Sequence, residues 1–234
     1  MSIGIILMSR APVPGKTKTR LETHLTPGDC AALHNGFLKD LSKMMISLTK
    51  RRGDLNLYLS YTPEDSRGMF RDIIPSQFRL FPQYGDDLGI KMFNSLKYVH
   101  KLEKGPQIIM GSDLPTLQPE VILRAIKVLE EKDFVIGPSD DGGYYLLGCK
   151  RPYRFLFDDM NWGNSNVFEA TIESIKERDD FDYGLVDCWW DVDTYPELLK
   201  LKYVLSRKEE WTIYPENTAE VLRSIFLKVM ANVK

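Results

Sequence analysis

The sequence predicts an α/β domain in which helices cover both faces of a mostly parallel mixed sheet. Two observations lead to this fold class: short apolar runs alternate with amphipathic stretches of helical period, and several of the runs are apolar throughout. A strand that is covered on both faces shows no polar alternation, because neither face meets water. Strands that alternate with helices are typical of parallel strands joined by crossover helices. The predicted strands are residues 3–9, 54–61, 77–82, 107–111, 134–138, 144–149 and 183–187.

The helices and one antiparallel strand follow from the segments between these runs. Apolar residues recur at three- and four-residue spacing within residues 37–48, 88–99 and 121–129. The sequence Asp-Asp-Gly-Gly at residues 140–143 interrupts the alternation, because it joins two strands through a turn. We therefore expect the strand at residues 144–149 to run antiparallel.

The C-terminus adds a last helix to a single domain that spans residues 1–234. Asn217 followed by Glu220 predicts a capping box, in which each side chain bonds to the backbone at the other position, ahead of an apolar-periodic stretch. We expect residues 205–234 to form a C-terminal extension that packs on the body of the domain.

Composition and charge exclude several classes of protein. Hydrophobic residues make up 43% of the 234 residues, which is enough for a sizeable core. The net charge of −2 argues against a general nucleic-acid or membrane binder, which needs a basic balance to meet a phosphate surface. The three cysteines lie far apart without Cys-x-x-Cys spacing, so neither a disulfide framework nor a cysteine zinc site is indicated. The sequence has neither a signal-peptide pattern nor an apolar run of membrane length, and we expect a cytoplasmic protein.

Charged and small residues follow the predicted strands, at the edge where an open α/β sheet binds its ligands. The loop after the first strand contains Arg10, Lys16, Lys18 and Arg20 and no acidic residue. Lysine and arginine bind phosphate oxygens, carboxylates hold Mg²⁺ or Mn²⁺, and glycines let the backbone come close to a ligand. These residues therefore predict a phosphorylated ligand with a hard divalent cation. The segments that follow the other strands are residues 83–89, 112–115, 139–143 and 189–193.

The cationic loop is not a P-loop, although Gly15-Lys16-Thr17 ends like one. The P-loop pattern needs glycine at position 10, where this chain has arginine. Pro12 and Pro14 also remove two backbone N–H groups that would have to bind phosphate. The alternative is that the cations are ordinary solvated surface charges. Their place after the first strand of the sheet favours a function.

Five motifs occur in an order that resembles one bacterial and archaeal family. The motifs are Ala-Pro-Val-Pro-Gly-Lys-Thr-Lys-Thr-Arg-Leu at residues 11–21, Gln-Tyr-Gly-Asp-Asp-Leu-Gly at 83–89, Gly-Ser-Asp-Leu-Pro at 111–115, Gly-Pro-Ser-Asp-Asp-Gly-Gly-Tyr-Tyr-Leu-Leu-Gly at 137–148 and Asp-Val-Asp-Thr at 191–194. The family is that of the nucleotide-diphospho-sugar-transferase-like proteins of the radical-SAM/selenodomain-associated transferase type, which have a glycosyltransferase-A fold. The chain is similar, more distantly, to the phospholactate guanylyltransferases and the molybdenum-cofactor guanylyltransferases.

The resemblance implies a role for each motif. Asp113 takes the place of the metal-binding aspartate of this fold, and Asp191 and Asp193 match the second acidic position, so that all three are implied ligands of Mg²⁺ or Mn²⁺. The cations of the first loop would bind phosphates and stabilise the charge that develops on the leaving group. The implied catalytic residues are Lys16, Lys18, Arg20 and Asp113; the implied nucleotide-binding residues are Arg10, Pro14, Gly15, Gln83, Gly85 and Leu88; the implied acceptor-binding residues are Asp141, Gly142, Gly143 and Trp162.

Structural alternatives stand beside several of these roles. Asp113 could be the N-cap of the helix that follows it, and Asp191 or Asp193 could cap a helix that begins near Thr194. The Asp-Gly-Gly sequence at residues 141–143 is also a good hairpin turn, which is compatible with a place in a site. The histidines, His34 among them, have no partner spacing, and we expect them at the surface or packed in the core.

The sequence favours nucleotidyl transfer from a nucleoside triphosphate to a phosphorylated small-molecule acceptor. The long cationic loop suits pyrophosphate, which is a more highly charged leaving group than a nucleoside diphosphate. Glycosyl transfer from a nucleotide sugar is the first alternative, although Ser-Asp-Leu at residues 112–114 replaces a compact Asp-x-Asp. A nucleotide-binding module without turnover is the second alternative. We expect neither nucleic acid nor a membrane as a partner, and a homodimer stays open.

Overall fold

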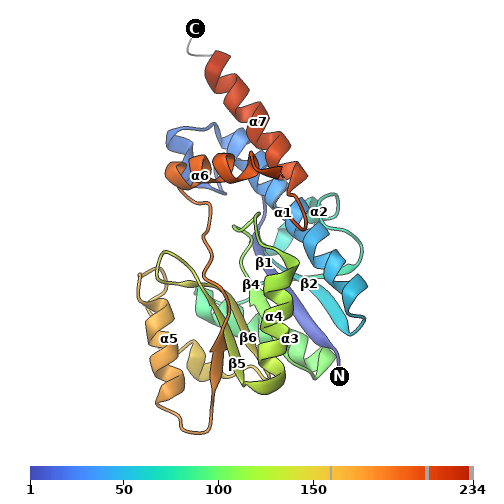
Figure 1. Ribbon diagram of the computed structural model, residues 1–234, viewed down its shortest axis with the longest axis vertical. Coiled ribbons are helices and arrows are strands. Elements are labelled where there is room, and N and C mark those ends of the chain that lie inside the picture. The colour runs from blue at the N-terminus through green and yellow to red at the C-terminus, as the bar shows by residue number, and fades with distance from the viewer. Residues whose placement is uncertain (159, 209–210, 232–234) are drawn as a thin grey trace.

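One sheet of seven strands forms the centre of residues 1–158, 160–208 and 211–231, the part of the chain that this computed structural model describes, the side chains of residues 229–231 excepted (Figure 1). The strand order is β3-β2-β1-β4-β6-β5-β7. Strand β6 is antiparallel to both of its neighbours, β4 and β5, and the other pairs are parallel. The strands are β1 (Ile3–Arg10), β2 (Leu55–Thr62), β3 (Phe78–Pro82), β4 (Gln107–Met110), β5 (Phe134–Pro138), β6 (Tyr144–Cys149) and β7 (Tyr183–Leu185).

All seven predicted strands are confirmed, and so is the antiparallel direction of β6 after the Asp-Asp-Gly-Gly turn. The bounds differ from the predicted ones by at most two residues, and the largest difference is at β7, which ends at Leu185. The mostly parallel mixed sheet with helices on both faces is therefore the observed fold class.

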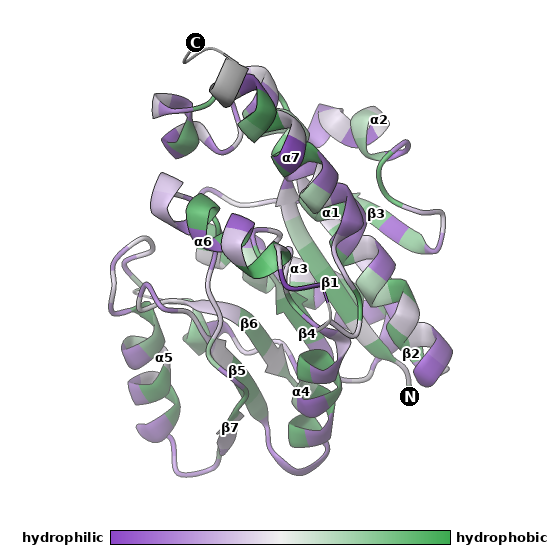
Figure 2. Ribbon diagram, turned by 45° about the horizontal axis from the view of Figure 1, so that its top comes forward, coloured by the Kyte–Doolittle hydropathy of each residue, from purple (hydrophilic) through white to green (hydrophobic). Residues whose placement is uncertain are grey.

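Helices cover both faces of the sheet. Alternate side chains of β1 enter different cores, because Ile5 and Leu7 pack with α1 and α4, whereas Ile6 packs with α3 and α5. The helices also turn hydrophilic sides away from the hydrophobic strands (Figure 2). The helical elements are η1 (Thr19–Thr23), α1 (Pro27–Arg51), η2 (Glu64–Ser66), α2 (Arg67–Phe70), α3 (Leu88–Glu103), α4 (Pro119–Glu131), η3 (Arg154–Leu156), α5 (Val167–Lys176), α6 (Tyr195–Leu205) and α7 (Glu216–Ala231).

The helix starts show which aspartates are engaged in capping. The Asp87 side chain accepts a hydrogen bond of 2.8 Å from the Ile90 N–H and caps α3. Helix α4 begins after Gln118, and α6 begins after Thr194, which forms a capping box with Glu197. The capping alternatives for Asp113, Asp191 and Asp193 are therefore wrong, since the N-cap residues of these helices are Gln118 and Thr194.

The C-terminal helix is held by a cap from another helix. Because α7 begins at Glu216, Asn217 lies inside its first turn and the predicted Asn217–Glu220 capping box is wrong. The buried Asp40 of α1 instead accepts the N–H groups of Asn217 at 3.2 Å and of Thr218 at 2.7 Å. A contact of this kind leaves no local signal, because the two partners are far apart in the sequence.

A third apolar cluster lies beyond the sheet, where α6 and α7 pack against η1 and the N-terminal half of α1 (Figure 1). Its members include Leu21, Phe37, Leu198 and Ile225. The division of the chain at residue 205 stays a prediction, and residues 209–210 and 232–234 of that extension lie outside the described residues. None of the described helices combines the length and the apolar character that are needed to cross a bilayer.

Candidate functional site

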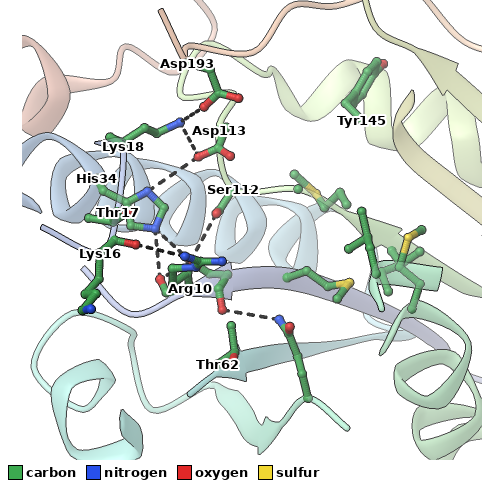
Figure 3. A pocket seen from close by; sticks show the side chains of 18 of the residues that line it. Arg10, Lys16, Thr17, Lys18, His34, Thr62, Ser112, Asp113, Tyr145 and Asp193 are labelled. Carbon is green, nitrogen blue, oxygen red and sulfur yellow. Dashed lines mark hydrogen bonds and ion pairs between the residues drawn. The ribbon is translucent and has the colours of Figure 1, made fainter. Parts of the chain in front are cut away.

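A pocket of about 420 Å³ opens where the parallel strands end (Figure 3). The carboxyl ends of β1, β2 and β4 contribute Arg10, Thr62 and Met110, and the loop after β4 contributes Asp113. Tyr144 at the start of the antiparallel β6 faces the same pocket. Pockets that bind small ligands have volumes of about 300–1,000 Å³, so this one can enclose a substantial part of a nucleotide. Its position is the one that the sheet topology favours for a ligand.

Lys18 is the centre of the charged side of the pocket (Figure 3). Its ammonium nitrogen lies 2.5 Å from Asp113 Oδ1 and 2.9 Å from Asp193 Oδ1. It also donates a hydrogen bond of 2.7 Å to the Val192 carbonyl oxygen, and the side chain is only 2% exposed. Burial alone would lower the pKa of Lys18, but the charges of the two carboxylates outweigh burial and hold the pKa above its ordinary value. Lys18 is therefore a buried, charged lysine and not a solvated surface charge.

Asp113 is held ionised by the cation beside it. Burial would raise the pKa of its carboxyl group, but Lys18 and then His34 lower the pKa below the ordinary value. The side chains of Asp113 and Asp193 are 37% and 41% exposed, so each carboxylate keeps an open side. The pair thus has oxygen atoms available for a ligand in addition to those that contact Lys18.

His34 lies in this pocket, where the sequence analysis did not place it. It projects from α1, and its ring is 3% exposed. Its Nε2 lies 3.0 Å from Ser9 Oγ and 3.1 Å from the Arg10 carbonyl oxygen, and its Nδ1 lies 3.7 Å from Asp113 Oδ1. Burial lowers the pKa of His34, which favours the neutral ring. A signal was present in the sequence, because the apolar Leu33 and Phe37 place His34 on the buried side of a helix that directly follows the cationic loop.

The cationic loop divides into residues that reach the pocket and residues that do not. Arg10 and Lys16 line it, and an Arg10 guanidinium nitrogen donates a hydrogen bond of 3.1 Å to the Lys16 carbonyl oxygen. Pro14 and Gly15 are exposed at the tip of the loop, where Gly15 has a φ of +73°. Arg20 is exposed in η1 and is not among the residues that line the pocket. The structure thus brings Arg10, Lys16 and Lys18 together but not Arg20.

The implied nucleotide-binding residues of the segment after β3 are partly engaged in the fold. Gln83 and Leu88 line the pocket, whereas Gly85 does not. The Gln83 amide nitrogen donates a hydrogen bond of 2.8 Å to the Ser60 carbonyl oxygen of β2. Gly85 has a φ of +136°, and a Cβ there would lie 2.5 Å from Ile90 Cγ2, so glycine is required for the turn into α3.

The predicted acceptor segment forms the turn between β5 and β6. The Asp141 carboxylate accepts hydrogen bonds from the Ser139 hydroxyl and, at 3.0 Å, from the Gly143 N–H. Gly142 has a φ of +87°, and a Cβ there would lie 1.9 Å from the Ser165 carbonyl oxygen. The hairpin-turn alternative is confirmed, and the role of these residues toward an acceptor stays a prediction.

Trp162 supports the pocket wall from behind. Its ring packs against Gly89 at the start of α3, where a Cβ would lie 2.4 Å from the indole nitrogen. It also stands edge-on to Tyr144, with ring centroids 6.4 Å apart, and Tyr144 lines the pocket. Trp162 itself is not among the lining residues.

Asp191 is a carboxyl group of this site whose ionisation is opposed by its surroundings. Burial raises its pKa to about 7, and the negative charges of Asp113 and Asp193 add to the effect. In the part of the chain that the structure describes, no three His, Cys, Asp or Glu side chains converge closely enough to hold a metal ion by themselves. Asp113 and Asp193 nevertheless keep carboxylate oxygen atoms that Lys18 does not contact, and Asp191 lies in the same segment as Asp193.

Comparison with known proteins places the chain in a family. Residues 45–164 match the family described as "Uncharacterized protein conserved in bacteria (DUF2064)". The chain belongs to this family. The matched DUF2064 region runs from the last two turns of α1 to beyond η3 and includes Asp113 but neither Lys18 nor Asp193. No protein of curated function matches the chain by sequence.

Three solved structures share the fold of this DUF2064 protein. A protein from Desulfovibrio desulfuricans G20, provisionally assigned as a nucleotide-diphospho-sugar transferase, is 28% identical with a TM-score of 0.83 over 96% of this chain and 95% of its own. A 4-diphosphocytidyl-2C-methyl-D-erythritol synthase from Anaerococcus prevotii DSM 20548 is 12% identical with a TM-score of 0.56, covering 88% of this chain and 99% of its own. A cytidylyltransferase from Leptospira borgpetersenii serovar Hardjo-bovis is 15% identical with a TM-score of 0.53, covering 96% and 94%. The last two establish the fold alone.

Proposed function

We propose that this protein is a nucleotidyltransferase that moves a nucleotidyl group from a nucleoside triphosphate to a phosphorylated small-molecule acceptor. The proposal rests on one observation: Arg10, Lys16 and Lys18 lie in the same pocket as the carboxylates of Asp113 and Asp193, at the carboxyl edge of the sheet. It is supported by the resemblance to the D. desulfuricans protein and by the cytidylyltransferases that share the fold.

The cations account for the binding of a polyphosphate. In this reaction an acceptor oxygen attacks the α-phosphorus, the bond from that phosphorus to the bridging oxygen breaks, and pyrophosphate leaves. Arg10 and Lys16 hold phosphate oxygens, and Lys18 stabilises the charge on the leaving group. Because pyrophosphate carries more charge than a nucleoside diphosphate, three cations suit nucleotidyl transfer better than glycosyl transfer. Arg20 lies outside the pocket, and its catalytic role stays a prediction.

The donor set fits Mg²⁺ or Mn²⁺. Asp113 and Asp193 offer carboxylate oxygens, and the Lys18 ammonium between them is itself a stand-in cation. Mg²⁺ is commonly held by one or two carboxylates, while substrate phosphates and water complete its coordination. Asp113 and Asp193 would hold the ion, with Asp191 beside them. When bound, such an ion neutralises phosphate charge and aligns the reacting groups.

A thermal-shift panel with and without Mg²⁺ tests the proposal. GTP, CTP, UTP, ATP and several nucleotide sugars are compared, because a ligand stabilises the state that it binds. We expect a metal-dependent rise in Tm with one triphosphate. Lys16→Ala should weaken triphosphate binding at least about tenfold and binding of the monophosphate much less, because the lost charge-assisted hydrogen bond contributes about 1.5–3 kcal/mol.

The matched control is Lys39→Ala, which removes an exposed lysine of α1 that does not line the pocket. Equal losses for triphosphate and monophosphate would remove the role of Lys16. A shift with a nucleotide sugar alone would refute nucleotidyl transfer and favour glycosyl transfer. Pyrophosphate release that Asp113→Asn abolishes, while nucleotide binding persists, would exclude a binding module without turnover.

A further inference from the structure

Lys18 takes the place that a metal ion needs. Its ammonium group contacts three oxygen atoms, from Asp113, Asp193 and the Val192 carbonyl group, at 2.5, 2.9 and 2.7 Å. These are hard oxygen donors of the kind that a divalent cation prefers. A cation bound to these same three oxygen atoms and the ammonium group cannot occupy this position together.

We propose that Lys18 is a built-in counter-ion that closes the metal position of the ligand-free protein, so that metal and polyphosphate bind only together. The inference rests on the proposed function, because it concerns the same metal and the same phosphates. It adds that neither ligand binds well alone.

The charges around Lys18 explain why one ligand is not enough. A metal ion that arrives alone expels a 2% exposed ammonium group from both of its carboxylates and leaves it without an anion. A polyphosphate that arrives alone draws Lys18 away and leaves the two carboxylates facing more negative charge. Removing one partner of such an ion pair is costly, because the buried ammonium group of Lys18 then has no counter-charge. When both ligands arrive, the metal takes the carboxylates and the phosphates take Lys18, so every charge keeps a partner.

The backbone conformation of Lys18 is a second sign that this side chain is held in place. In the described residues, Lys18 and Lys104 are the two non-glycine residues with positive φ, at +52° and +55°. Lys104 is the C-cap of α3, which is an ordinary place for a left-handed residue. Lys18 instead is the N-cap residue of the short helix η1, and its carbonyl oxygen accepts a hydrogen bond of 2.9 Å from the Leu21 N–H. A left-handed conformation at a residue other than glycine costs energy, which the contacts of the Lys18 side chain help to offset.

Lys16 is a lysine of the same loop that does not contact the carboxylates. It lines the same pocket, but its side chain points away from Asp113 and Asp193 (Figure 3). It therefore offers a matched control, with the same charge in the same loop and no contact with either carboxylate.

Mn²⁺ titrations followed by electron paramagnetic resonance test the inference without any measurement of activity. In the absence of phosphate, Lys18→Gln should bind Mn²⁺ at least about tenfold more tightly than the wild type, because no ammonium group then occupies the position of the ion. A tenfold change in the dissociation constant corresponds to about 1.4 kcal/mol. Lys18→Arg, which keeps the charge, should stay within about threefold of the wild type, and Lys16→Gln within about twofold, because a charge at a distance is screened. Asp193→Asn in the Lys18→Gln background should cancel the gain, which places the ion at this pair.

A second measurement needs no variant that could fail to fold. Inorganic tripolyphosphate, which carries no base, is added to the wild type, and its own binding of Mn²⁺ is subtracted with a titration without protein. We expect tripolyphosphate to tighten Mn²⁺ binding at least about tenfold, and Mn²⁺ to tighten tripolyphosphate binding by the same factor, since coupling is reciprocal.

The outcomes separate this inference from the proposed function. Lys18→Gln that binds Mn²⁺ no more tightly than the wild type, or no detectable Mn²⁺ binding in either protein, overturns the inference. Independent binding of Mn²⁺ and tripolyphosphate to the wild type also overturns it. A wild type that binds metal and triphosphate without the Lys18→Gln gain retains the proposed function alone. If Lys18→Gln gains affinity for Mn²⁺ but no nucleotide binds to the protein, the counter-ion role of Lys18 is supported and the proposed function is refuted.

Discussion

Asp191→Asn is expected to stabilise the metal-free protein at alkaline pH. The carboxyl group of Asp191 has a pKa of about 7 in the folded protein, because burial and the charges of Asp113 and Asp193 oppose its ionisation. Its ordinary value is 3.8. Between these values the folded state binds the proton and the unfolded state does not. The free energy of unfolding therefore falls as the pH rises through this window.

The size of the effect follows from the two pKa values. The interval from 3.8 to about 7 corresponds to about 4 kcal/mol of destabilisation at pH 8. The side chain is partly exposed, so relaxation reduces this value, and we expect Asp191→Asn to gain about 2–4 kcal/mol at pH 8. The gain should shrink to below about 1 kcal/mol at pH 4, where Asp191 is protonated in the folded state.

Urea unfolding in the presence of EDTA at pH 4, 6 and 8 measures this profile. The control is Asp187→Asn on the same segment, which removes an ion pair with Arg124 whose partners are both more than half exposed. Exposed pairs contribute about 0–1 kcal/mol, so the control should change little at any of the three pH values. A loss of stability on Asp191→Asn at pH 8, or a gain that does not depend on pH, would refute the charge repulsion in this site.

Two further substitutions test how the fold supports the site. Asp40→Ala removes the carboxylate that caps α7, and we expect a loss of about 3 kcal/mol in urea unfolding from charge-assisted hydrogen bonds of about 1.5–3 kcal/mol each. The exposed-pair control Lys43→Ala should lose less than about 1 kcal/mol, and equal losses in the two variants would argue against the cap. Gly142→Ala sets a Cβ 1.9 Å from the Ser165 carbonyl oxygen at a φ of +87°, so we expect a loss of more than about 2 kcal/mol, and a neutral result would contradict the tight turn.

The strands could be predicted from the sequence because burial on both faces leaves a local mark. Several strands of the sheet are apolar over most of their length, and the topology then follows from the order of strands and helices. The same rule placed the charged loops at one edge of the sheet, and Arg10, Lys16, Lys18, Asp113 and Asp193 do lie in one pocket there.

The contacts within the site could not be predicted, because they join residues without a shared periodicity. Lys18 and Asp193 are 175 positions apart, and nothing in either segment marks the other as its partner. Arg20 and Lys18 also look alike in the sequence, although Arg20 faces solvent and Lys18 is buried. Only the packing of η1 separates them, since the turn that buries Leu21 leaves Arg20 outside.

The second carboxylate of the site depends on helices that contribute nothing to the pocket. Among the described residues, none from α6 or α7 lines the pocket, but Asp193 stands directly before α6. That segment is tied to η1 by the stacking of His24 on Tyr195, with ring centroids 3.9 Å apart, and by the hydrogen bond from Lys18 to Val192. The apolar cluster of η1, α1, α6 and α7 lies behind both contacts. Local opening of α6 and α7 would therefore remove the support behind Asp193 and leave Lys18 with Asp113 as its remaining carboxylate, so the completeness of the site is linked to the docking of the C-terminal helices.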